Sequence, residues 1–108
     1  MAKRKIETEL TLTGEEKFKR AIAEINNGTK VLNSEMRKLT AEYDGNTDSV
    51  EFLTQKYDIL ERQMLTQKDK VEVLKQAVAD SAAAYGEADS RTQNWIIQLN
   101  NAEAALAN

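Results

Sequence analysis

The sequence predicts an all-α protein: an antiparallel helical hairpin, or coiled coil, of two long helices plus a shorter third helix, preceded by a short N-terminal β-strand. Three observations support this prediction. Apolar residues recur at alternating spacings of four and three in two long runs, the pattern of a coiled-coil seam. A cluster of turn-forming residues, Asp44 to Ser49, separates the runs. The chain has no proline, so no residue forces a kink within either run.

The composition limits the functions to consider. The 108 residues suffice for a single elongated domain, 1–108. Cysteine and histidine are both absent, which excludes thiolate chemistry and the most common general base. The net charge of −3 does not favour a nucleic-acid partner. No apolar run approaches the ~20 residues of a membrane span, and we expect no secretory signal behind the basic start.

Residues 5–13 alternate between apolar and polar side chains. Ile6, Leu10 and Leu12 share one face, and this period of two predicts a short strand. A single strand has no ladder partner of its own, so we expect it to pair elsewhere. Thr13 and Glu16 have the spacing of a capping box, which predicts that a helix begins at residue 14.

The first long helix is predicted over 14–43. Its apolar line consists of Phe18, Ile22, Ile25, Leu32, Met36, Leu39 and Tyr43, with Thr29 at the polar position of the series. Asn27 and Gly28 favour a turn. Because the apolar line keeps its phase across them, we interpret this point as a tolerated weak spot in a continuous helix.

The segment between the two long runs predicts a turn. Gly45 suits the left-handed position after a helix, and Asp48 or Ser49 suits the cap of the next one. Asp44, Asn46 and Asp48 also have the spacing of the first ligands in a calcium loop. That motif requires glycine at its sixth position and glutamate at its twelfth, where this chain has Ser49 and Gln55. We therefore expect no metal site.

The second long helix is predicted over 49–85. Its apolar line consists of Leu53, Tyr57, Leu60, Met64, Gln67, Val71, Leu74, Val78, Ser81 and Tyr85. Folding this line onto the first helix pairs Leu39 with Leu53, Met36 with Tyr57 and Leu32 with Leu60, and it brings Glu35 beside Lys56.

The same pairing puts Gln67 near Ile25 and Thr29. A polar layer of this kind restricts alternative registers. Two polar residues that are merely tolerated beside the weak spot explain the pattern equally well.

A third helix is predicted over 90–107. Gly86 followed by Asp89 and Ser90 is typical of a helix end and a new cap, which favours a turn after Tyr85. The spacing of seven also continues in phase through Thr92 and later residues, so an uninterrupted helix stays open as the alternative. The last residues carry no stop signal, and we expect the chain to be part of a longer one.

No set of residues predicts a catalytic, cofactor-binding or metal site. Ser49 and Ser90 have no histidine to activate them, and the carboxylates occupy polar helical positions. Basic residues near the start are interleaved with glutamates, which argues against a specific nucleic-acid site. We therefore expect no enzymatic activity, no cofactor, no small-molecule substrate and no membrane contact from this segment.

A second apolar line on the second helix predicts self-association. Phe52, Ile59 and Val73 lie one position ahead of residues in the main line. If the first helix packs on the main line, Phe52 and Ile59 stay exposed. We expect a dimer or higher oligomer through this face of the second helix and through the N-terminal strand.

Three runs of the sequence resemble the amino-terminal segment of phage tail tape measure proteins. They are Leu10 to Ile22, Leu-Thr-Leu-Thr-Gly-Glu-Glu-Lys-Phe-Lys-Arg-Ala-Ile; Asn33 to Leu39, Asn-Ser-Glu-Met-Arg-Lys-Leu; and Arg91 to Glu103, Arg-Thr-Gln-Asn-Trp-Ile-Ile-Gln-Leu-Asn-Asn-Ala-Glu. The similarity extends over essentially the whole chain.

The resemblance implies a structural protein of a phage or prophage tail. Members of the family are long helical proteins that fill the tail tube and determine tail length during assembly. Phage tail proteins would then be partners, and the chain would occur in the virion tail and, during assembly, in the bacterial host cytoplasm. The family supplies no catalytic residues for this segment. An alternative from another class is a host coiled-coil adaptor or regulatory protein that binds a partner helix.

Overall fold

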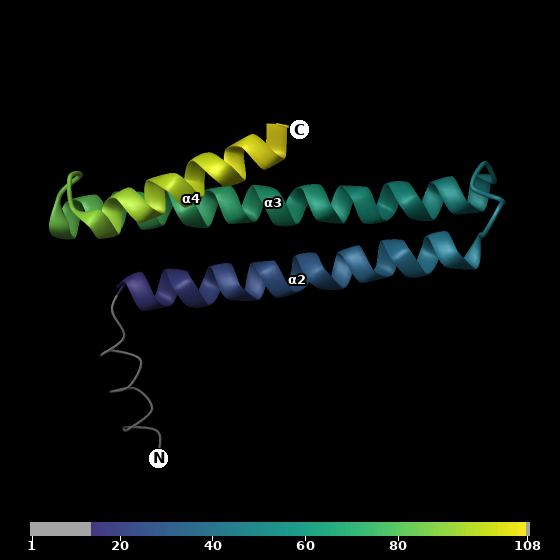
Figure 1. Cartoon of the computed structure of the whole chain (residues 1–108), viewed down its shortest axis with the longest axis horizontal. Helices are drawn as coiled ribbons and strands as arrows, with labels where there is room; N and C mark the ends of the chain where they lie inside the picture. The colour runs from purple at the N-terminus through teal and green to yellow at the C-terminus, as the bar shows by residue number, and fades with distance from the viewer. Residues whose placement is uncertain (1–13, 108) are drawn as a thin grey trace, which may run out of the picture.

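The computed structural model describes residues 14–107, which form three helices: α2 (Gly14–Glu42), α3 (Val50–Tyr85) and α4 (Ser90–Ala107) (Figure 1). The prediction of three helices is confirmed, and each predicted end differs from the observed one by at most one residue. The predicted strand, 5–13, lies outside the described residues. Within 14–107, no helix combines the length and apolarity needed to cross a bilayer.

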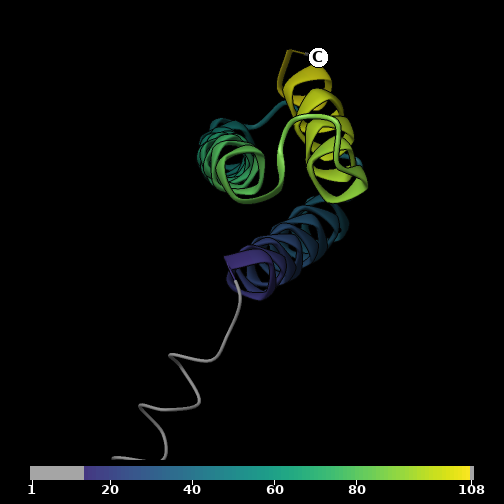
Figure 2. The same ribbon diagram turned by 90° about the vertical axis from the view of Figure 1, so that its left-hand side faces the viewer.

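The chain reverses direction twice. α2 and α3 run antiparallel along most of their lengths, and α4 turns back along the half of α3 that ends at Tyr85 (Figure 1). Seen end-on, the three helices stand at the corners of a triangle rather than in one layer (Figure 2). α3 is therefore the central element, and it packs its backbone against both other helices.

Local capping explains where the helices end. Gly45 has φ of 75°, and the Ser49 hydroxyl accepts a hydrogen bond of 3.1 Å from the backbone N–H of Phe52, which makes Ser49 the cap of α3. At the other end, Gly86 has φ of 93° and stops α3. The predicted turn after Tyr85 is confirmed, and the alternative of an uninterrupted helix is wrong.

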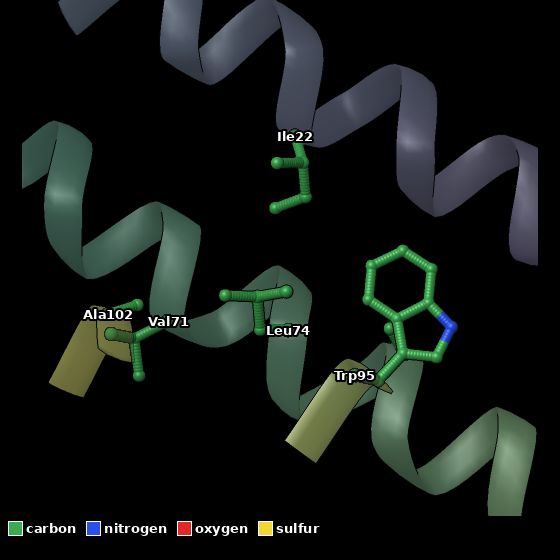
Figure 3. Packing of buried hydrophobic residues seen from close by; sticks show 6 residues of the cluster. Ile22, Val71, Leu74, Trp95 and Ala102 are labelled. Atoms are coloured by element: carbon green, nitrogen blue, oxygen red, sulfur yellow. The ribbon is translucent and has the colours of Figure 1, made fainter. Parts of the chain in front are cut away.

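One hydrophobic cluster joins all three helices. Ile22 of α2, Leu74 of α3 and Trp95 of α4 converge in it, together with Val71, Ala77 and Ala102 (Figure 3). The ring of Trp95 packs edge-on against Phe18, with 6.2 Å between centroids. Leu74 is 0% exposed. This cluster is the contact through which α4 reaches α2.

A second cluster joins only α2 and α3. Leu39, Phe52 and Ile59 are buried there, and Met36, Tyr43 and Leu53 pack around them. Tyr43 and Phe52 make an edge-to-face pair with 5.6 Å between ring centroids. Phe52 and Ile59 therefore lie inside the protomer, and the prediction that these two side chains stay exposed is wrong.

The predicted register between the long helices is also wrong. Glu35 pairs with Arg62 at 3.2 Å instead of lying beside Lys56, and Asn33 accepts a hydrogen bond from Gln63. Tyr57 and Leu60, predicted as partners of Met36 and Leu32, are exposed.

The reason is that α3 serves two helices and therefore needs two apolar lines. Neighbouring residues lie about 100° apart around a helix axis, so the line through Phe52 and the line through Leu53 face different directions. α2 takes the first line. α4 takes the second, through Leu74.

Candidate helix-binding surface

Five residues of α3 form an apolar line, of which only Leu53 packs against the cluster that α2 and α3 share. They are Val50, Leu53, Tyr57, Leu60 and Met64, spaced three, four, three and four residues apart, and we name them the exposed stripe. The exposed fractions are 76% for Val50, 63% for Tyr57, 41% for Leu60 and 46% for Met64, while Leu53 is half-buried. Such spacing places all five on one face of the helix.

The exposed stripe continues the line that α4 covers. The same spacing leads on from Met64 through Gln67 to Val71, Leu74 and Ser81. In that half, Val71 and Leu74 are buried in the cluster with Trp95 and Ala102, and Ser81 shares a hydrogen bond of 2.7 Å with Thr92. Over the described residues, α4 therefore covers the half of the line nearer to Tyr85.

A polar layer marks the boundary between the two halves. The Gln67 amide donates to the Thr29 hydroxyl at 3.2 Å, and that hydroxyl donates to the backbone carbonyl of Ile25 at 3.1 Å. The predicted proximity of Gln67 to Thr29 is confirmed. Because these polar groups satisfy one another, the layer carries little penalty for its partial burial.

Polar contacts with α2 fix the orientation of α3 beside the exposed stripe. Gln63 donates to Asn33 at 2.9 Å, and Arg62 bridges Glu35 at 3.2 Å and Asp58 at 3.1 Å. Each exposed ion pair contributes only a few tenths of a kcal/mol. Together with Phe52 and Ile59 they hold the α2-facing side of α3 inward, which leaves the stripe directed outward.

The corner between α3 and α4 is held by charge. Asp89 accepts hydrogen bonds from the backbone N–H of Arg91 at 2.8 Å and from its guanidinium at 2.9 and 3.0 Å. The guanidinium carbon lies 3.4 Å from the centroid of the Tyr85 ring. The side-chain bond from Arg91 lowers the pKa of Asp89 to about 2, and the same bond raises the pKa of Arg91. These contacts fix the direction in which α4 starts.

The residues considered as calcium ligands or as nucleophiles do not form a common site in the structure. Asp44, Asn46 and Asp48 lie in the turn that Gly45 and Ser49 organise, and within 14–107 no three His, Cys, Asp or Glu residues are grouped as metal ligands would be. Ser49 caps α3, and Ser90 begins α4.

Four residues of the exposed stripe, Leu53, Tyr57, Leu60 and Met64, were predicted as one apolar line but were assigned to the contact with the first helix. Val50 was missed, although its spacing to Leu53 continues the line. A search of protein-family models, of curated proteins and of solved structures found no match to this chain.

Proposed function

We propose that this chain is a structural assembly module of a phage or prophage tail, the amino-terminal part of a tape measure protein that takes part in tail assembly and tail-length determination. It works through helix–helix binding and not through catalysis. Its place is the virion tail and, before assembly is complete, the cytoplasm of the bacterial host. Its partners are phage tail proteins and further coiled-coil helices.

The observation that carries the helix-binding part of this proposal is the exposed stripe. Val50, Tyr57, Leu60 and Met64 present an apolar face at coiled-coil spacing on a helix that α2 already holds in place. A rigid, amphipathic face of this kind is how helices recognise other helices. The assignment to a phage tail is supported by the resemblance of the three sequence runs, of which Arg91 to Glu103 builds most of α4.

The polar groups of the described helices support a structural role. The buried hydroxyls of Ser81 and Thr92 bond to each other, and Ser49 and Asp89 act as caps. Each of these groups thus has a role in folding that accounts for its position.

The direct test is to locate the chain in the particles. Prophage induction in the bacterium that encodes it, followed by purification of virions and mass spectrometry, should find peptides of this chain in tails. Deletion of the gene should leave heads without tails, or tails of altered length, in electron micrographs. Recovery of the chain only in complexes of host proteins, with normal tails after deletion, would favour the alternative of a host adaptor or regulatory protein.

A further inference from the structure

We propose that Asp44, at the corner between α2 and α3, is a site of spontaneous covalent modification, where the main chain isomerises to isoaspartate. Asn27, which glycine also follows, is protected from the corresponding reaction by α2. The modification is separate from the helix-binding surface and goes beyond the proposed function. Its only co-reactant is water.

The reaction needs a glycine after an aspartate or an asparagine. The backbone nitrogen of the glycine gives up its proton to solvent and attacks the side-chain carbonyl carbon of the preceding residue. The new N–C bond closes a five-membered succinimide ring, and the side chain releases water from aspartate or ammonia from asparagine. Glycine favours this step because no side chain crowds the attacking nitrogen.

Water then opens the ring at one of its two carbonyl carbons. Opening at the main-chain carbonyl breaks the original peptide bond and leaves the chain running through the side chain, which is isoaspartate. Opening at the other carbonyl gives ordinary aspartate. The net change at Asp44 is an isomerisation, because the water released in the first step is taken up in the second.

The sequence contains two pairs that meet this requirement, Asn27–Gly28 and Asp44–Gly45. Asparagine followed by glycine is the faster pair in unstructured peptides, because an amide is attacked more readily than a carboxylate. The residues alone would therefore place the reaction at Asn27. The structure reverses this order.

The attacking nitrogen is free at the corner. Asp44 and Gly45 are both exposed, and a methyl group built on Gly45 would meet open space. The backbone N–H groups of Asp44 and Asn46 donate to carbonyls at 3.3 and 2.7 Å, whereas the N–H of Gly45 between them has no hydrogen-bond partner among the described residues. Nothing thus has to open before this nitrogen can react.

The corresponding nitrogen of Gly28 is engaged. Gly28 lies midway along α2, where each backbone N–H donates to the carbonyl four residues earlier. α3 holds this part of α2 as well, because Lys70 donates to Asn26 at 3.0 Å and Gln67 donates to Thr29 at 3.2 Å. Attack by Gly28 therefore requires local opening of the helix, and its rate falls with the fraction of time that the helix is open.

Incubation of the folded chain at neutral pH and growth temperature, followed by digestion with trypsin, tests the proposal. Asp44 lies in the tryptic peptide 39–56 and Asn27 in the peptide 21–30. Isoaspartyl methyltransferase should label the first peptide, electron-transfer fragmentation should locate isoaspartate at position 44, and the second peptide should keep its amide. Asp44→Glu is the control and should stay unlabelled there, because its ring would have six members and closes slowly.

The variant Asp44→Asn compares the two positions within one molecule, since both then carry an asparagine followed by glycine. In the folded chain, position 44 should deamidate about ten times faster than Asn27 or more, and in denaturing urea the two rates should converge. Circular dichroism before incubation establishes that the variant is folded.

Three results would overturn the proposal. The first is a wild type without isoaspartate at position 44 after incubation that modifies an unstructured peptide of residues 39–56. The second is deamidation of Asn27 in the folded Asp44→Asn chain as fast as at position 44. The third is a ratio of the two rates that urea leaves unchanged, because the difference would then not arise from the helix.

Discussion

The two halves of α3 carry the same apolar spacing and end in opposite environments. Around Leu74 the line is enclosed by α4, with α2 on the neighbouring face, and the side chain is fully buried. Around Leu60, two heptads earlier, the same line faces outward. The comparison teaches that a heptad pattern indicates an apolar face but does not identify its neighbour: α4 lies over the half around Leu74 and not over the half around Leu60.

Truncating Trp95 is expected to have the largest effect on stability, because it removes the side chain with which α4 packs on α3. Both halves of the apolar line on α3 would then be uncovered. Trp95→Ala should lower the free energy of unfolding by about 3–5 kcal/mol and release α4 from α3. Urea denaturation followed by circular dichroism measures the loss, and amide hydrogen exchange should accelerate in α4 first. The exposed neighbour Ile97, changed to Ala, serves as control with a cost below about 0.5 kcal/mol.

The second test compares the equivalent leucines directly. Leu74→Ala should cost about 2–5 kcal/mol as a truncation in a packed core, whereas Leu60→Ala should cost no more than about 1 kcal/mol because its side chain is partly exposed. Thermal and urea denaturation at low micromolar protein, where association contributes least, provide the comparison. Equal losses would show that the halves are equally enclosed.

The third test addresses the hydrogen bond that joins α3 to α4. Ser81→Ala or Thr92→Val should each cost about 1–3 kcal/mol, because each leaves a buried hydroxyl without its partner. The double variant should cost less than the sum, since no unpaired hydroxyl then remains. A double-mutant cycle in urea measures the coupling. Strict additivity would mean that the two hydroxyls do not depend on each other.

A smaller effect of opposite sign is expected at the boundary between the halves. A methyl group at Gly28, within α2, would meet open space, so Gly28→Ala should stabilise the chain by about 0.4–1 kcal/mol. Gly45→Ala should destabilise it, because φ of 75° is unfavourable for alanine. The melting temperatures of the two variants should therefore move in opposite directions from that of the wild type.

The smallest expected effect is a change of stability with pH, and it arises only at the corner between α3 and α4. The pKa of Asp89 is about 2 in the folded chain and 3.8 ordinarily. A lowered folded pKa stabilises the protein above the ordinary value, and this contribution is lost as the pH falls from about 4 to about 2.

Asp89→Asn, which keeps an acceptor at the cap, should therefore lower the melting temperature at pH 7 and converge with the wild type near pH 2. A difference between the two chains that persists unchanged at low pH would contradict the ion pair as its source. NMR titration of the Asp89 carboxyl would give its pKa directly.

The sequence was sufficient to predict the helices because their ends depend on neighbouring residues. Gly45, Ser49, Gly86 and Asp89 set the turns through their own backbone angles and caps. The register could not be predicted in the same way. Two apolar lines run along α3, and which of them α2 covers depends on which of them α4 covers, which is a property of the whole fold.

For the same reason, the sequence did not show which apolar line of α3 forms the candidate helix-binding surface. Tyr57, Leu60 and Met64 were recognised as one apolar line, but the line was assigned to α2, and Phe52 and Ile59 were assigned to the surface. Their roles were exchanged because two apolar lines of similar strength run along one helix. Local spacing contains no information on which line receives which neighbour.

The antiparallel order of the three helices has a consequence for the order in which they fold during synthesis. The backbone of each helix packs closely only with the helix next to it in sequence, α2 with α3 and α3 with α4. Such local contacts close short loops and favour rapid folding. As the chain leaves the ribosome, we expect α2 and α3 to form a hairpin before Trp95 is available, so that α4 folds last onto a surface that is already complete.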